Sequence, residues 1–172
     1  AAGTELDVLC TGNLDLEVPF TREQSGGLFS CSVRPTAERW KLCEFHLDGH
    51  GYLRWAPLSG GAVDEKTGKR EVEEMHVLSE DTVVQYHDDS NPTNWFVSHG
   101  TMQARQALET NHDAGERRKH ATPPNVFTLS ARGRTLRLQA SSPVERARWV
   151  EVLTAECKDF DKAARSPSPR SP

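Results

Sequence analysis

The sequence predicts a mostly β domain with one C-terminal α-helix, in which about seven short strands form a bent sandwich or barrel capped by the helix. Three observations lead to this fold class. Short runs that alternate polar and apolar residues recur along the chain, and glycine- or proline-containing turns separate them. One amphipathic segment with an N-cap signature follows the last run. The length of 172 residues fits one domain with extensions.

The charge balance argues against a dedicated nucleic-acid binder. The chain has 21 Lys and Arg residues against 25 Asp and Glu residues, a formal net charge of −4, whereas such binders present a strongly basic surface. No run of about 18 apolar residues is present, so we expect no membrane-spanning helix. The chain begins at Ala1 without a charged-then-apolar leader, and we expect it to be a segment of a larger protein.

The four cysteines are predicted to be reduced and buried in an intracellular protein. Their spacing forms no disulfide framework, and two of them fall within strand-like runs. Free cysteines commonly serve as small apolar core residues. The residues are Cys10, Cys31, Cys43 and Cys157.

Residues 1–25 are interpreted as an N-terminal extension, with a short strand over 13–18 that Pro19 limits. The main domain is predicted to cover 26–160. Its first strands are expected over 28–33 and 39–47, and in the second the side chains of Cys43, Phe45 and Leu47 share one face. The glycine-containing turn at 48–51 predicts a hairpin into a strand over 52–56.

Further strands are predicted over 72–78, 82–86 and 95–97. A polar, charged stretch then interrupts the pattern, and we interpret about 98–124 as an insertion. Two strands, over 126–129 and 136–138, flank Arg132-Gly133-Arg134 and indicate a final hairpin.

The helix begins with a capping box. Ser142 precedes a proline at the first helical position, and Glu145 stands three residues after the serine. The apolar residues that follow recur at helical spacing and are expected to form the buried face: Trp149, Val150, Leu153 and Cys157. Residues 161–172 are predicted to be a disordered Ser/Pro tail, because they bury too little apolar area to offset their ordering entropy.

This order of strands, followed by one capped helix with a central Trp149, resembles the pleckstrin-homology (PH) domain. Trp40-Lys41, Phe45 and Leu47 are similar to the second-strand signature of that family. Residues 52–57 and 135–143 are most similar to the PH domains of phospholipase C and its inactive relatives, or of engulfment and motility (ELMO) scaffolds. The resemblance covers about residues 26–158 and carries no catalytic residue to this chain.

The resemblance implies a non-catalytic module that docks a larger protein to phosphoinositide-containing membrane. Such domains gather cations on the first strands, because a phosphorylated inositol ring carries several charges in a small volume. The candidate phosphoinositide-binding residues here are Arg34, Arg39, Lys41 and Arg54. A second basic rim could come from Lys66, Lys69 and Arg70.

A protein-interaction scaffold without significant lipid binding is the alternative. Acidic neighbours dilute the basic cluster (Glu38, Glu44 and Asp48), and PH-like barrels also bind peptides by strand addition. Both hypotheses stay open at this point. In either case we expect a cytoplasmic protein, peripheral to membrane under the first hypothesis, and a monomeric domain.

No metal site, cofactor or catalytic centre is predicted. Cys43, His46 and His50 have a metal-like spacing, but the odd separation of Cys43 and His46 places them on opposite faces of a strand. No hydrolase, zincin, Walker or Rossmann motif occurs. Three tail serines precede prolines and are candidate phosphorylation sites, although a plain linker is the simpler interpretation: Ser166, Ser168 and Ser171.

Overall fold

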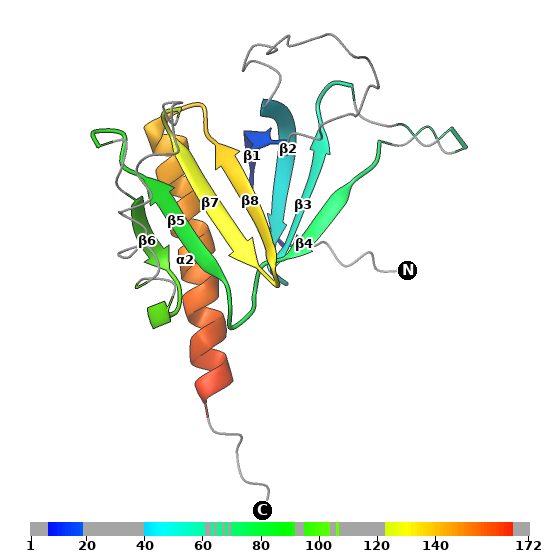
Figure 1. Ribbon diagram of the computed structural model, residues 1–172. Helices are drawn as coiled ribbons and strands as arrows, with labels where there is room; N and C mark the ends of the chain where they lie inside the picture. The colour runs from blue at the N-terminus through cyan, green and yellow to red at the C-terminus, as the bar shows by residue number, and fades with distance from the viewer. Residues whose placement is uncertain are drawn as a thin grey trace, which may run out of the picture.

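A computed structural model describes residues 7–18, 40–60, 63, 65, 66, 68, 70–91, 95–103, 106 and 123–166. These residues form eight strands in one antiparallel sheet and a long helix, α2 (Figure 1). The strands are β1 (Val8–Glu17), β2 (Trp40–Asp48), β3 (Tyr52–Pro57), β4 (Glu73–His76), β5 (Val83–His87), β6 (Trp95–His99), β7 (Val126–Ala131) and β8 (Arg134–Gln139). The predicted fold class is confirmed, with one strand more than the expected number.

Strand β1 joins the two halves of the sheet, whose order is β4-β3-β2-β1-β8-β7-β5-β6. It pairs with β2 from Val8 to Glu17 and with β8 at Asp15 and Leu16. Residues 8–17 therefore belong to the domain, and the prediction of an extension over 1–25 is wrong for them. Near Asp15 and Leu16 the strand is paired on both sides. The alternation of polar and apolar residues in one strand does not reveal such partners. The strand predicted over 28–33 lies outside the described residues.

Consecutive hairpins do not continue through the second half of the sheet. Strand β7 pairs with β5, and among the described strands β6 lies at the edge, with β5 as its one partner there. Strand β6 runs to His99, so the insertion predicted from residue 98 begins after it. Figure 1 shows β6 beside α2, and the hydroxyls of Ser98 and Thr154 join these two elements at 2.7 Å.

Two hairpin turns use the left-handed backbone region that glycine favours. Arg132 (φ 51°) and Gly133 (φ 74°) both have positive φ between Ala131 and Arg134, as the tight two-residue turn between β7 and β8 requires. Gly51, with φ 80°, ends the turn between β2 and β3, and a Cβ there would stand 2.3 Å from Leu78 Cγ. Both predicted turns are confirmed.

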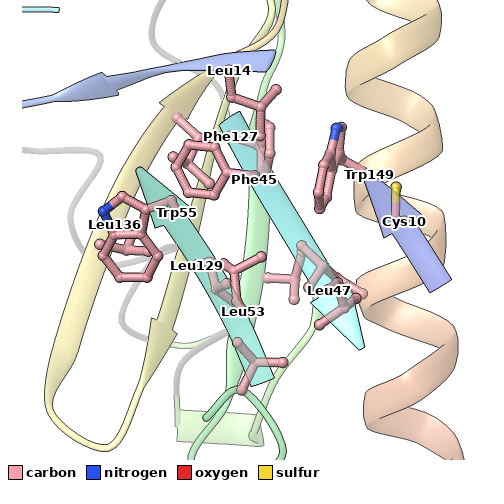
Figure 2. Close-up of a cluster of buried hydrophobic side chains, with 14 of the residues drawn as sticks. Cys10, Leu14, Phe45, Leu47, Leu53, Trp55, Phe127, Leu129, Leu136 and Trp149 are labelled. Atoms are coloured by element: carbon pink, nitrogen blue, oxygen red, sulfur yellow. The ribbon is translucent and has the colours of Figure 1, made fainter. Parts of the chain in front are cut away.

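The core fills the concave side of the sheet and the inner face of α2 (Figure 2). Phe45 stacks on Trp55 with ring centroids 5.6 Å apart and meets Trp149 edge to face at 6.4 Å. The predicted inner face of β2 is buried, as is the predicted helix face. Cys10, Cys43 and Cys157 are free thiols within the core.

Helix α2 (Pro143–Arg165) is longer than predicted. Ser142 Oγ accepts a hydrogen bond from Glu145 N at 3.1 Å, but the Glu145 carboxylate reaches back to Ser141 rather than to Ser142. Residues 161–165, predicted as tail, are helical, and Lys162 and Arg165 in this last turn complement the negative end of the helix. The rest of the predicted tail lies outside the described residues. No helix in the described parts has the length and apolarity that crossing a membrane demands.

Candidate functional site

The structure describes two of the four predicted phosphoinositide residues and does not bring those two together. Lys41 alternates with the buried Cys43 and Phe45, so it faces the concave side of the sheet. Arg54 pairs in register with the exposed His46 and faces the convex side. His46 stands five positions further along β2 than Lys41, which is about 17 Å at a rise of about 3.4 Å per residue. Arg34 and Arg39 lie outside the described residues.

Arg54 is held by two carboxylates on the convex face. Its guanidinium donates to Asp48 Oδ2 at 2.8 Å and to Glu74 Oε2. Asp48 is 3% exposed, and its Oδ1 accepts from the backbone N–H groups of His50 and Tyr52, each at 3.0 Å. This network closes the turn between β2 and β3, so the described surroundings of Arg54 are those of a structural residue.

A different pair of charged residues meets on the concave side. Arg134 begins β8, Glu73 begins β4, and the Arg134 Nη2 group donates to Glu73 Oε2. Three strands separate β4 from β8 in the sheet order, so these side chains touch only because the sheet curls back on itself. We call the place where they meet over Trp55, with Lys41 on the same inner face near the start of β2, the open corner.

The Trp55 ring forms the floor of the open corner. It is 1% exposed, and the Arg134 guanidinium lies over it, 4.9 Å from the ring centroid. Figure 2 shows Trp55 and Leu136 on one side of the core, with Trp149 beside α2 on the other. The open corner is therefore the side of the barrel that the helix does not cover.

The Cys43 thiol lies within electrostatic reach of both Lys41 and Glu73. Burial raises the pKa of Cys43, the charge of Lys41 lowers it, and the charge of Glu73 raises it again. The strand registers place both side chains on the same inner face as Cys43. A polar ligand at the open corner would meet Lys41, Arg134 and the competing carboxylate of Glu73.

The sequence carries a signal for Arg134 besides the turn. Arg132-Gly133-Arg134 places two guanidinium groups near one hairpin turn, and guanidinium binds phosphate and carboxylate through paired N–H donors. Glu73 carried no such signal, because its partner is 61 residues away in the sequence. In the second basic rim, Arg70 donates to the carbonyl oxygen of Pro57 at 3.3 Å, and Lys69 lies outside the described residues.

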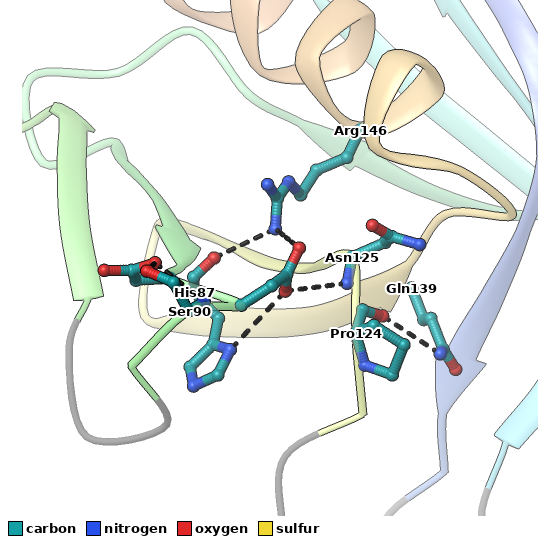
Figure 3. Close-up of polar contacts among 8 residues, drawn as sticks. His87, Ser90, Pro124, Asn125, Gln139 and Arg146 are labelled. Carbon is teal, nitrogen blue, oxygen red and sulfur yellow. Dashed lines mark hydrogen bonds and ion pairs between the residues drawn. The ribbon is translucent and has the colours of Figure 1, made fainter.

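A polar cluster near the start of α2 has a structural role (Figure 3). Arg146 Nη1 donates to the carbonyl oxygen of His87 and to Asp89 Oδ2, both at 2.9 Å. Asp89 Oδ1 accepts from the backbone N–H of Asn125 at 3.0 Å. The cluster therefore ties the helix to the ends of β5 and β7.

The remaining sequence candidates are placed as follows. Cys43 is buried and His46 is exposed, so they lie on opposite faces of β2 as the spacing predicts. Ser166 caps α2: its backbone N–H donates to the Ala163 carbonyl, and its hydroxyl donates to the Lys162 carbonyl at 3.1 Å. Ser168 and Ser171 lie outside the described residues.

Comparison with solved structures decides the fold. The C-terminal PH domain of human pleckstrin 2 matches with a TM-score of 0.52 at 17% identity, over 98% of this chain and 96% of that one. The chain has the PH fold. The C-terminal PH domain of human pleckstrin gives a TM-score of 0.48 at 16% identity, over 91% of this chain and 93% of that one. The PH domain of human oxysterol-binding protein-related protein 11 gives 0.45 at 16%, over 100% and 98%.

At the level of sequence, no family model and no curated protein matches the chain. The finer resemblance to the PH domains of phospholipase C or ELMO scaffolds therefore stays a prediction. At identities of 16–17% the structural matches describe the fold alone.

Proposed function

We propose that this PH-fold chain is a non-catalytic module that docks a larger cytoplasmic protein to phosphoinositide-containing membrane. The observation that carries the proposal is the open corner, where Lys41 and Arg134 lie on the same concave face of the sheet, away from the helix. A polyphosphorylated headgroup carries several charges and can engage two cations on one face. The fold supports such a role without specifying the ligand.

Within this proposal, the headgroup contacts are Arg34, Arg39, Lys41 and Arg134. Arg39 directly precedes β2, and Lys41 is the second residue of that strand. Arg134 is half exposed, with 45% of its side-chain surface open to solvent. Arg54 is given a supporting role, because Asp48 and Glu74 hold its guanidinium at the convex face.

Vesicle co-sedimentation tests the proposal. Vesicles with and without phosphatidylinositol bisphosphate are mixed with the wild type and with a Lys41→Ala/Arg134→Ala variant. We expect binding that needs the phosphoinositide and a loss in the variant of about 2 kcal/mol, roughly thirtyfold in affinity, at about 1 kcal/mol per basic residue. A Lys158→Ala/Arg148→Ala variant is the matched control, because it removes the same charges from the exposed surface of α2.

The salt dependence separates specific from nonspecific attraction. The two double variants are compared at low salt. If both weaken vesicle binding equally, the attraction depends on the net charge of the protein, and this result would contradict a site at the open corner. Absence of binding at low salt, where attraction is strongest, would rule out the membrane role.

The second candidate function is a protein-interaction scaffold. The pairing of basic groups with carboxylates favours it: Arg54 is held by Asp48 and Glu74, and Arg134 by Glu73. The exposed edge of β6 beside α2 would be the surface for strand addition. This function becomes the working answer if vesicles do not bind. A Phe96→Glu change, which places a charge at a side chain that is 42% exposed on β6, would then be expected to abolish partner binding.

We also propose that Ser166, Ser168 and Ser171 are phosphorylation sites that modulate docking. Each precedes a proline. A phosphate on Ser166 would remove its hydroxyl donor to the Lys162 carbonyl and would place negative charge at the negative end of α2. In a phosphorylated sample, we expect faster amide exchange in the last turn of α2, and unchanged exchange there would contradict this effect.

A further inference from the structure

The contact between Glu73 and Arg134 lies where, under the proposed function, an anionic ligand would bind. It joins the two halves of the sheet at the open corner, and its side chains are 51% and 45% exposed, so the pair is accessible from solvent. A carboxylate and a phosphate bind guanidinium through the same planar N–H donors. The two anions therefore compete for one group.

We infer that Glu73 is a built-in competitor for Arg134, which restricts the open corner to ligands carrying two or more phosphate groups. The inference rests on the proposed function for the class of ligand, and it adds a residue that sets the selectivity. Glu73 lies on the inner face because it pairs in register with Trp55. Its carboxylate thus points toward the same corner as Lys41 and Arg134.

The selectivity follows from the number of cations that each ligand engages. A single phosphate on Arg134 replaces one anion with another, and the displaced Glu73 is left close to the new negative charge. A ligand with two phosphates also engages Lys41, which lies on the same inner face of β2 as Phe45, the residue in register with Trp55 and, through it, with Glu73. The contact to Lys41 offsets the loss of the Glu73 pair.

The neighbouring residue supplies a matched control. Glu74 has a similar exposure of 45% and also pairs with an arginine, Arg54, but it faces the convex side of the sheet. Glu73→Gln and Glu74→Gln therefore remove the same charge from adjacent positions of one strand. Only the first change affects the open corner.

Calorimetric titration with soluble inositol trisphosphate and inositol monophosphate tests the inference. We expect Glu73→Gln to bind the trisphosphate about fivefold more tightly, which is the scale of an exposed ion pair, and to gain measurable monophosphate binding. Glu74→Gln should match the wild type. In the Arg134→Gln background, the Glu73→Gln change should bring no gain, because the group under competition is gone.

The outcomes separate this inference from the proposed function. If the wild type binds the trisphosphate and Glu73→Gln binds no more tightly, the competitor role is overturned and the docking function stands. If only Glu73→Gln binds, the competitor role is supported and docking by the wild type is overturned. If neither binds, both are overturned, provided that the Trp55 indole N–H resonance shows a folded corner in each variant.

Discussion

At Gly12, the β1 backbone passes directly beneath the helix. A Cβ atom there would lie 3.0 Å from Glu145 Oε1 and 3.2 Å from Trp149 Nε1. The carboxylate can move, but the Trp149 ring is 1% exposed and fixed by the core. The absence of a side chain at this position therefore lets the helix tryptophan reach the sheet.

We expect Gly12→Val to destabilise the fold by about 1–3 kcal/mol, the usual cost of overpacking a core. Thr11→Val is the control, because Thr11 is exposed and its neighbour Gly12 faces the opposite side of β1. Urea denaturation followed by tryptophan fluorescence measures both. Equal stability of the two variants would mean that Trp149 can shift away from β1.

Asp48 is the residue on which the turn between β2 and β3 depends. Burial by itself would raise the pKa of Asp48, but hydrogen bonds from the backbone N–H groups of Tyr52 and His50, together with Arg54, hold the pKa below its usual value. The charged form is therefore the one that the folded state stabilises. This makes Asp48 a contributor to stability at neutral pH.

At the scale of the element, the cap of α2 shows how local sequence directs a helix. Ser142 Oγ accepts from Glu145 N, and the helix then presents Trp149, Leu153 and Cys157 to the core at helical spacing. The signature needs only neighbouring residues, so the sequence predicted its position correctly. The cap sets where the helix begins, and that starting point agrees with the spacing that buries its apolar side chains.

We expect Ser142→Ala to lower the free energy of unfolding by about 1 kcal/mol and Ser142→Gly by only a few tenths of a kcal/mol. The difference arises because glycine leaves the backbone N–H groups open to water, whereas alanine shields them without accepting a hydrogen bond. Thermal denaturation followed by circular dichroism provides the comparison. The cap would have no energetic role if the alanine variant unfolded at the wild-type temperature.

At the scale of the whole molecule, acid is expected to weaken the fold. The pKa values of Asp48 and Asp81 are lowered, for Asp81 chiefly by the Ser79 hydroxyl, so their stabilisation is present above the unfolded value of about 3.9 and is lost as pH falls through the folded values. Asp15 acts in the opposite direction, because burial raises its pKa. Asp48 is the one of these three that is almost fully buried.

Melting temperatures measured between about pH 7 and about pH 3 check this expectation. The wild type should lose stability below about pH 4, and Asp48→Asn should start about 2 kcal/mol less stable, the scale of a disrupted buried hydrogen-bonded charge, and lose less on acidification. Asp159→Asn, at an exposed position of α2, is the control and should follow the wild type. Parallel curves for wild type and Asp48→Asn would exclude Asp48 as the acid-sensitive group.

Local sequence patterns were enough to predict the fold class, most of the strands after residue 39, the hairpin turns and the capped helix. Each of these depends on residues a few positions apart: the alternation of Cys43, Phe45 and Leu47, the φ that Gly133 permits, or the cap at Ser142. Such local preferences can be predicted from a single sequence, because the backbone sets the period of side chains along a strand or helix and the geometry of a turn.

Only the tertiary structure decided the place of β1, the edge position of β6 and the composition of the open corner. Glu73 meets Arg134 across three intervening strands, and Lys41 and Arg54 diverge although both carry positive charge on neighbouring strands. The curl of a sheet brings residues of distant strands together, while the pleat sends successive residues of each strand to opposite faces. Which residues of two strands share a face depends on their register, and neither the register nor the curl can be read from the spacing of charged residues along the chain.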